Sequence, residues 1–349
     1  MHAINILRFA THRQRRILFA LLVLCLAPAQ ADALSILSYN VAGIQASGSE
    51  PREALQRIVS YFDPDIIIFQ EAKGTQYPND FLASNPDYEG FYSSPDGAWN
   101  RLMIMSKHPI IPSSMREYQL GEGSLRPMFE LKIDLPGPHI LAVFTAHWDA
   151  SSAEVRENES AESVHVLQEF RTENPSTLYL YAGDFNVTDD SPLISALMEP
   201  ATGLTMFTPV CPITGSSATI NSRYWVVTYL DRRIDYILPS TELAAFGISG
   251  RILNTWEYAP QQSPPGLEQT DTVNASDHLP VYMHVRWRPI PGDANFDCRV
   301  NILDLIFIRN KLNQDAGTGD NWKADVNEDA RINILDLIFV RNKLNTACP

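Results

Sequence analysis

The segment LYLYAGDFN (residues 178–186) decides the fold, because an apolar run of strand length ends in a polar loop. The same change from apolar to polar ends DIIIFQE (65–71) and HILAVFTAH (139–147), at Glu71 and His147. Loops at the ends of strands often carry functional side chains on a rigid scaffold. We therefore expect a functional site where these strands end.

Strands and helices alternate around these three segments. Apolar residues at helical spacing predict helices over residues 51–62 and 153–170, and the stretch 257–276, rich in Pro, Gln, Ser and Thr, predicts a mobile loop. The alternation predicts one mixed α and β domain over residues 34–287. The other predicted strands are LSILSYNV (34–41), LMIMS (102–106), FELKID (129–134), RIDYIL (233–238) and LPVYMHVRW (279–287).

Residues 1–31 are predicted to be a secretory signal peptide. Four arginines without an acidic residue precede the apolar run Ile17 to Ala27, which is short for a transmembrane span. Ala29 and Ala31 then provide a small-residue cleavage site. We therefore expect a secreted, extracellular protein without a transmembrane anchor.

The charge of the chain argues against one kind of binding surface. The sequence has 41 acidic and 27 basic residues, a formal net charge of -14. Nonspecific binding of nucleic acid depends on Lys and Arg that neutralise phosphates. A broad basic groove is therefore not expected, although a bound divalent metal ion could bring positive charge to the site.

A duplicated segment is the strongest pattern in the chain. GDANFDCRVNILDLIFIRNKLN begins at Gly292, and ADVNEDARINILDLIFVRNKLN begins at Ala324. Each copy places oxygen-bearing side chains at loop positions 1, 3, 5, 9 and 12, a spacing that wraps a loop around one Ca²⁺. The predicted calcium ligands are Asp293, Asn295, Asp297, Asn301 and Asp304 in the first copy, and Asp325, Asn327, Asp329, Asn333 and Asp336 in the second.

This repeat resembles the type I dockerin family. The resemblance implies a small all-α domain of two calcium-loop–helix repeats at residues 292–349, two bound Ca²⁺ ions, and a cohesin module on a scaffold protein as partner. The loop position that is normally Gly is Cys298 and Ala330 here. Dockerin-like pairs bring the two ends of the module together, which predicts a Cys298–Cys348 disulfide. The partner-contacting positions of the family fall on apolar residues in both copies: Ile302, Leu303, Ile334 and Leu335.

Several short polar segments of the first domain together indicate phosphoester chemistry. Carboxylates and an amide can hold a hard divalent ion, a second carboxylate–amide pair can orient water, and histidines can transfer protons near neutral pH. A carboxylate can also fix the tautomer of a histidine. The candidates are Asn40 in SYN, Glu71 in FQE, Arg126 in LRP, His147 in TAHWD, Asp184 and Asn186 in GDFN, Asp235 in RRID, and Asp277 and His278 in SDH.

The order of these residues resembles the endonuclease/exonuclease/phosphatase superfamily, including its deoxyribonuclease and sphingomyelinase branches. The resemblance implies a four-layer α/β/β/α sandwich with the site at one edge of the paired sheets. It implies Mg²⁺ or Mn²⁺ held by Glu71, with Asn40 and Asp277 nearby. The other implied roles are a catalytic His278 paired with Asp235, a second catalytic histidine at His147, nucleophile alignment by Asp184, transition-state stabilisation by Asn186 and a phosphate contact at Arg126. Family members usually follow the first histidine with Leu, where this chain has Trp148.

The combined prediction is a secreted, metal-dependent hydrolase of phosphodiester or phosphomonoester bonds that is attached to a scaffold by its dockerin. Nucleic acid is the leading substrate. The alternatives are a phospholipid or small-molecule phosphoesterase, and a catalytically inactive binding module displayed by the dockerin.

Overall fold

A computed structural model describes most of the chain beyond the predicted signal peptide, which lies outside the described residues. The described residues are 34–95, 100–135, 139–220, 231–259, 262–286, 290–295, 297, 299–316, 319–327 and 329–347. No helix in these segments combines the length and apolar character that crossing a membrane requires.

The first sheet contains the N-terminal strand in a central position. Its six strands lie in the order β10-β11-β1-β2-β4-β3. β1 pairs in parallel with β2 and antiparallel with β11, so that Asn40 lies opposite Gln70 at one edge of the sheet. The strands are β1 (Leu34–Asn40), β2 (Ile66–Gln70), β3 (Glu89–Tyr92), β4 (Met103–Ser106), β10 (Ile248–Ile252) and β11 (Val281–Val285).

The second sheet has five strands in the order β5-β6-β7-β8-β9. β7 and β8 are parallel, and the long helix α4 (Ala153–Glu173) connects them. The other neighbouring pairs are antiparallel. The strands are β5 (Ile110–Gln119), β6 (Pro127–Leu135), β7 (His139–His147), β8 (Leu178–Asp184) and β9 (Asp235–Pro239).

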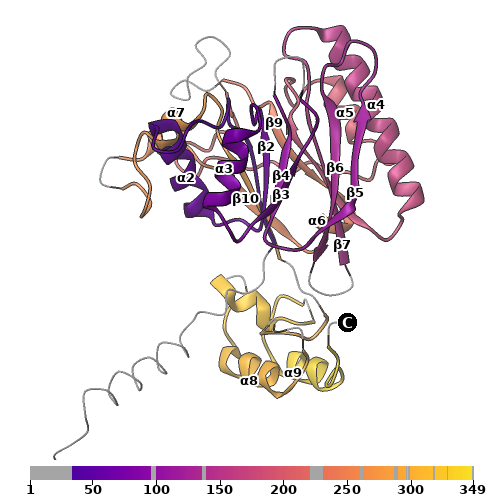
Figure 1. The fold of residues 1–349 in the computed structure, drawn as a ribbon. Coiled ribbons are helices and arrows are strands. Elements are labelled where there is room, and N and C mark those ends of the chain that lie inside the picture. Colours follow the sequence, from indigo (N-terminus) through magenta and orange to yellow (C-terminus); the bar gives the residue numbers. More distant parts are fainter. Residues whose placement is uncertain are drawn as a thin grey trace, which may run out of the picture. The chain divides into compact units, whose positions relative to one another are not determined.

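The two sheets pack face to face and helices cover both outer faces, as Figure 1 shows. Apolar side chains from both sheets form the central core, while α2 (Glu50–Phe62) and α3 (Gln76–Ser84) cover the first sheet. Helix α4 and the short α5 (Pro192–Leu197) cover the second sheet. The predicted four-layer α/β/β/α sandwich is confirmed.

The expected strands and both expected helices are present, but the described residues of the stretch 257–276 include regular structure that was not predicted. It contains the end of a 3₁₀ turn, η1 (Thr255–Glu257), and the helix α7 (Asp271–Ala275). The buried carboxylate of Asp271 accepts hydrogen bonds from Arg57 Nε at 2.9 Å and Nη2 at 2.7 Å. This pairing with α2 holds a helix too short to show any periodicity in the sequence.

The C-terminal module has its own apolar core and is described by itself. It contains α8 (Ile302–Lys311), the 3₁₀ turn η2 (Gly319–Ala324) and α9 (Ile334–Arg341). Each α-helix begins with a capping box, in which the N-cap asparagine and the aspartate three residues later exchange hydrogen bonds. The buried core residues are Ala294, Val300, Ile308, Ala316, Ala324, Val326, Ile332 and Val340.

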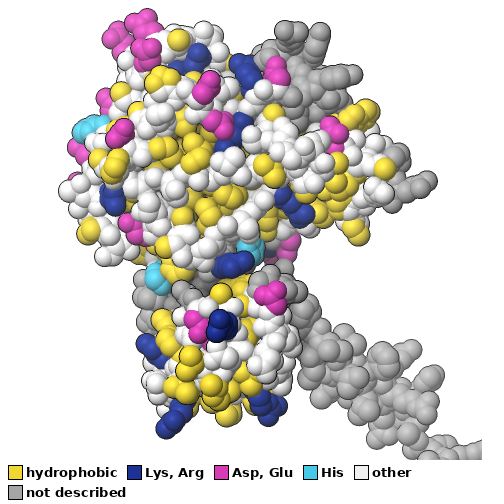
Figure 2. Space-filling view, turned by 180° about the vertical axis from the view of Figure 1, so that it is seen from behind, with side chains coloured by type: hydrophobic (Ala, Val, Ile, Leu, Met, Phe, Trp, Pro, Cys, Tyr) yellow, Lys and Arg dark blue, Asp and Glu magenta, His cyan; other side chains and the backbone are white. Residues whose placement is uncertain are grey.

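The outer surface of this module carries exposed apolar side chains at equivalent places in both repeats. Ile302 and Ile334 are 62% and 61% exposed, and Leu303 and Leu335 are also exposed. Figure 2 shows hydrophobic side chains lying next to Lys and Arg at the lower end of the view, where the module is drawn. These are the positions that the sequence predicts for contact with a partner.

Candidate active site

Three of the predicted residues lie side by side because of strand register. His147 ends β7 opposite Asp184 at the end of β8, and Asp184 in turn lies opposite Asp235 at the start of β9. All three side chains are buried. The edge of the second sheet therefore places one imidazole and two carboxylates next to each other.

His278 completes this row from the other sheet. It follows α7, and its Nδ1 lies 2.9 Å from Oδ2 and 3.1 Å from Oδ1 of Asp235. Burial lowers the pKa of His278, but the carboxylates of Asp235 and Asp184 outweigh this and raise its pKa to about 10. His278 is therefore protonated at neutral pH.

Asp184 contacts four of the other predicted site residues. Its Oδ2 accepts a hydrogen bond from Asn40 Nδ2 at 3.1 Å, and lies 3.5 Å from His147 Nε2 and 3.7 Å from His278 Nε2. Its Oδ1 accepts from the backbone nitrogen of Asn186 at 3.0 Å. Burial raises the pKa of Asp184, against the opposing effect of the His278 charge. This carboxylate consequently binds a proton more readily than an exposed aspartate.

Glu71 stands at the end of β2 in a strained backbone conformation. Its φ is 56°, a left-handed value that costs a non-glycine residue roughly 1–2 kcal/mol. Its Oε1 accepts from Asn40 Nδ2 at 3.2 Å and lies 4.0 Å from His147 Nε2, while its Oε2 lies 3.5 Å from Lys73 Nζ. Strain of this kind is common at functional sites, where it aims a side chain.

His147 differs from His278 in its charge state. Burial, followed by the positive charges of Arg126 and His278, lowers the pKa of His147 well below its ordinary value. Its Nδ1 is buried and has no hydrogen-bond partner among the described residues. No carboxylate of the described residues therefore orients this ring through Nδ1. The site pairs a neutral histidine with a protonated one.

The backbone carbonyl of Trp148 links two further predicted residues. It accepts hydrogen bonds from Arg126 Nη1 at 3.2 Å and Asn186 Nδ2 at 2.9 Å, and Arg126 Nη1 also donates to the carbonyl of His147 at 3.0 Å. The Trp148 indole is fully buried, donates to the Tyr181 hydroxyl at 3.0 Å and stacks on Phe185. The turn after β7 thus holds Arg126 and Asn186 against the site.

The structure leaves Asp277 outside the hydrogen-bonded group that the other predicted residues form within the described segments. Asp277 is partly exposed, and its Oδ1 lies 3.4 Å from Ser276 Oγ. The remaining candidates, Asn40, Glu71, Arg126, His147, Asp184, Asn186, Asp235 and His278, are brought together.

The oxygen-bearing side chains at the site fit a hard divalent metal ion, except that the amide of Asn40 is turned the wrong way. Carboxylate oxygens are the ligands that Mg²⁺ prefers, and the Glu71 side chain is 23% exposed and lines a pocket with Arg101, Arg126 and His147. Asn40 points its amide nitrogen at the carboxylates, and its Oδ1 accepts from Ala42 N at 3.1 Å. Asn40 would have to turn its amide over to act as a ligand.

Two groups of potential ligand atoms lie within 4.8 Å of one another in the described chain. The first is Asp184, Asp235 and His278, at the active site. The second is Glu50, Glu268 and Asp271, where the guanidinium of Arg57 already forms ion pairs with all three carboxylates. In the first group the protonated His278 has no lone pair to offer a metal ion, which leaves the carboxylates of Asp184 and Asp235 as its possible ligands.

Several supporting residues were not predicted from the sequence. Ser276 Oγ donates to the backbone carbonyl of Asn40 at 2.7 Å and accepts from His278 N at 3.2 Å, which ties the SDH segment to the end of β1. The buried Gln70 amide reaches Ser38 and Thr145 on opposite sheets. The position of Ser276 inside the SDH segment was the available signal for its role.

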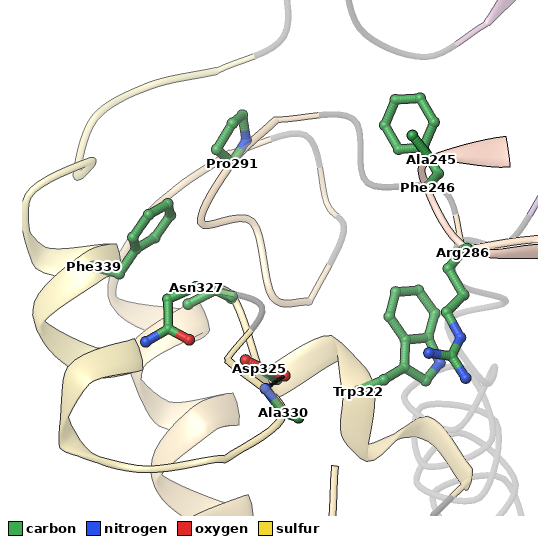
Figure 3. A pocket seen from close by; sticks show the side chains of 11 residues that line it. Ala245, Phe246, Arg286, Pro291, Trp322, Asp325, Asn327, Ala330 and Phe339 are labelled. Atoms are coloured by element: carbon green, nitrogen blue, oxygen red, sulfur yellow. Dashed lines mark hydrogen bonds between the residues drawn. The ribbon is translucent and has the colours of Figure 1, made fainter. Parts of the chain in front are cut away.

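In each of the two predicted calcium loops, hydrogen bonds hold predicted ligand residues together. In the first loop, Asp293 Oδ1 accepts from Asp297 N at 3.1 Å, and in the second, Asp325 Oδ1 accepts from Asp329 N at the same distance. Figure 3 shows Asp325, Asn327 and Ala330 close together in the second loop. Ala330 has a φ of 64°, so at the loop position that is normally Gly a residue with a Cβ adopts the left-handed conformation.

Two family models match parts of the sequence. The sequence model of the endonuclease/exonuclease/phosphatase family matches residues 37–278, and that of the dockerin type I domain matches residues 291–345. No curated protein matches the chain.

Solved structures with the same fold include a TDP2 protein, a 3′ phosphatase and a mannosyl-6-phosphatase. Truncated TDP2 of Caenorhabditis elegans has a TM-score of 0.53 and 18% identity, covering 73% of this chain and 97% of that one. The 3′ phosphatase NExo of Neisseria, bound to a product DNA hairpin, has a TM-score of 0.53 and 17% identity, and the match covers 73% of this chain and 100% of that one. A mannosyl-6-phosphatase of Bacteroides thetaiotaomicron has a TM-score of 0.53 and 17% identity, and the match covers 72% of this chain and 99% of that one. At these identities the likeness concerns the fold.

Proposed function

Because the chain belongs to the endonuclease/exonuclease/phosphatase family of phosphoester hydrolases and carries a type I dockerin domain, we propose that it is a secreted, metal-dependent phosphodiesterase that a scaffold protein displays. The domain boundaries that we propose are a signal peptide at residues 1–31, the catalytic domain at 34–287 and the dockerin at 292–349. Nucleic acid is the leading substrate in this proposal.

The observation that carries the proposal is the presence of two histidines in opposite charge states on either side of one buried carboxylate. His278 is protonated through Asp235, His147 is neutral, and Asp184 lies within 4 Å of a ring nitrogen of each. Hydrolysis of a phosphoester needs a group that accepts a proton from water and a group that donates one to the leaving oxygen. This arrangement supplies both without a change of fold.

The residues then take complementary parts in the reaction. Arg126 binds a phosphate oxygen, Asp184 with Asn186 orients the attacking water, and the neutral His147 accepts a proton from that water. The water oxygen bonds to phosphorus as the bond to the leaving oxygen breaks, and the Nε2 proton of His278 goes to that leaving oxygen. Glu71, with Asp277 and a turned Asn40, would hold Mg²⁺ or Mn²⁺. When bound, the ion neutralises the charge of the phosphate.

Two observations bear on the identity of the substrate and favour different classes of molecule. A site with a second histidine in place of the tyrosine of abasic-site enzymes resembles the deoxyribonuclease and sphingomyelinase branches of the family. The net charge of -14 works against a long polyanion and favours a small phosphoester or a lipid headgroup, which is the second candidate.

The C-terminal module supports display outside the cell. Its loops gather the predicted Ca²⁺ ligands, and its exposed Ile and Leu side chains suit contact with a cohesin module. A signal peptide is consistent with this placement. Sequencing of the N-terminus of the protein from the culture medium tests both the export and the cleavage after Ala31.

A panel of substrates tests the proposed activity. Plasmid DNA, bis(p-nitrophenyl) phosphate, p-nitrophenyl phosphate and sphingomyelin are each incubated with the full chain and Mg²⁺, with His278→Ala as the background control. Hydrolysis of the diesters above this background supports the proposal. Cleavage of p-nitrophenyl phosphate alone would make the protein a phosphomonoesterase, and no cleavage of any substrate would favour the inactive binding module.

A further inference from the structure

A buried glutamate outside the set discussed above joins two segments of the active site. Glu159 lies on α4 and is 1% exposed. Its Oε1 accepts a hydrogen bond from Ser124 Oγ at 2.8 Å, and its Oε2 accepts from the backbone nitrogen of Asp149 at 2.7 Å. Ser124 precedes Arg126, and Asp149 follows Trp148, whose carbonyl binds Arg126.

The segment before Arg126 rests on the same helix. Added Cβ atoms at Gly121 and Gly123 would approach Asn158 Cβ and Val155 Cγ2 to 3.0 Å, and both glycines have positive φ values. Asn158 Nδ2 also donates to the carbonyl of Glu122 at 3.1 Å. The close approach lets a side chain from α4 reach into the active-site region.

We infer that Glu159 is a positioning residue for Arg126, which it holds in place through Ser124 on one side and through the turn at Asp149 on the other. The inference rests on the proposed role of Arg126 as a phosphate contact. Glu159 would then support binding of the substrate phosphate without touching the substrate.

The hydroxyl of Ser124 makes this link sensitive to the proton on Glu159. Ser124 Oγ lies 2.8 Å from Glu159 Oε1 and 3.0 Å from the carbonyl oxygen of Arg126, but a hydroxyl has only one proton to donate. If Glu159 is ionised, that proton goes to the carboxylate. If Glu159 is protonated, it donates to Ser124 Oγ, and the hydroxyl is free to donate to the Arg126 carbonyl.

The surroundings of Glu159 favour a change of state near neutral pH. Burial raises its pKa to about 7, against the hydrogen bonds from Asp149 N and Ser124, while the Asp149 charge adds to the rise and the Arg126 charge opposes it. Tyr181 on β8 also interacts electrostatically with Glu159, and Arg156 on α4 donates a hydrogen bond to the Asp149 carbonyl in the same turn. We therefore expect Arg126 to be held more firmly as the pH falls through 7.

Calorimetric binding of inorganic phosphate to the full chain in Mg²⁺ tests this inference. Glu159→Ala and Ser124→Ala should weaken phosphate binding about tenfold and about threefold at pH 6. Glu159→Gln keeps a donor for Ser124 and an acceptor for Asp149 N at every pH. The phosphate affinity of Glu159→Gln divided by that of the wild type should be close to one at pH 6. The same ratio should be two or more at pH 8.5.

Glu130→Gln is the matched control, because Glu130 is also 1% exposed and accepts from Tyr118 at 2.6 Å, further along β6 and away from Arg126. It should leave phosphate affinity unchanged. Equal phosphate affinities for Glu159→Ala, Ser124→Ala and Glu130→Gln would overturn the inference. It would also be overturned if the ratio of the phosphate affinity of Glu159→Gln to that of the wild type stayed constant between pH 6 and 8.5. Because the readout is binding, these outcomes are independent of whether the wild type hydrolyses any substrate, which tests the proposed function.

Discussion

His278 Nδ1 lies 2.9 Å from Oδ2 of Asp235, and both side chains are almost completely buried. The pair joins the two sheets of the sandwich, because Asp235 begins β9 and His278 precedes β11. A hydrogen bond to Nδ1 leaves Nε2 directed at Asp184. The contact therefore fixes both the orientation and the charge of the ring.

Removing the histidine should abolish most of the activity without unfolding the protein. His278→Ala should lower kcat by roughly 10²-fold or more, because a proton donor is lost, and added metal should not restore it. Steady-state hydrolysis of bis(p-nitrophenyl) phosphate measures this. His165→Ala, an exposed histidine on α4, should remain fully active. A fully active His278→Ala would mean that the SDH segment has been assigned the wrong role.

Neutralising Asp235 should change the pH dependence of the reaction. The wild-type His278 stays protonated until the pH rises through about 10. Asp235→Asn removes the charge that raises the pKa most, so the protonated form should be lost at lower pH. The descending limb of the plot of kcat against pH should move to lower pH by at least one unit. An unchanged alkaline limb would contradict the claim that the charge of Asp235 keeps His278 protonated.

The buried indole of Trp148 should matter for stability. Trp148→Phe loses the hydrogen bond to Tyr181, and we expect the free energy of unfolding to fall by about 1–3 kcal/mol. Urea denaturation followed by circular dichroism measures the change. Trp256→Phe is the control, since Trp256 is 43% exposed and its replacement should cost less than about 0.5 kcal/mol. Equal losses in the two variants would exclude a special role for the Trp148 anchor.

The C-terminal module should bind two Ca²⁺ ions and become more stable when it does. Five oxygen-bearing side chains crowd each loop, and an ion that binds only the folded form stabilises it. Isothermal titration of the full chain with Ca²⁺, in excess Mg²⁺ to occupy the active site, should give two sites. Asp293→Ala and Asp325→Ala should each leave one. Fewer than one ion bound by the wild type would refute the module's assignment as a calcium domain.

The Cys298–Cys348 disulfide remains a prediction, because both cysteines lie outside the described residues. Their neighbours Arg299 and Ala347 form an antiparallel bridge, which is consistent with it. Closing a loop of this length could contribute on the order of 4 kcal/mol. Peptide mapping of secreted protein should find the two cysteines linked and Cys211, which is buried, as a free thiol. Free thiols at both positions would show that the bond is absent.

The sequence predicted best those features that follow from local patterns. His147, Asp184 and Asp235 each end or begin a strongly apolar strand, so their meeting at one sheet edge follows from the strand pattern and register. Strand β5, with the sequence IIPSSMREYQ, was not predicted. A proline interrupts the alternation of its apolar and polar residues, and its pairing with β6 contains a register shift. Such an irregular strand depends on its neighbours for its hydrogen bonds.

The supporting residues could not be found in this way. Glu159 is one of several glutamates on α4, and only the close packing of the Gly121–Gly123 segment separates it from the exposed ones. Likewise, the Trp148 carbonyl that Arg126 and Asn186 share is a backbone group, to which no side-chain motif corresponds. Contacts between distant segments decide these roles, and a single sequence does not reveal them.

The central claim is that a divalent metal bound through Glu71 is needed for hydrolysis, and one titration tests it most directly. The initial rate of diester hydrolysis is measured against Mg²⁺ concentration in chelator-treated wild type, Glu71→Gln and the exposed control Glu257→Gln. The wild type and the control should be inactive without metal and recover fully. Glu71→Gln should need at least tenfold more Mg²⁺ and recover partly, because one ligand has lost its charge. Undiminished hydrolysis by the wild type in excess chelator, or an unchanged Mg²⁺ requirement in Glu71→Gln, would contradict the account.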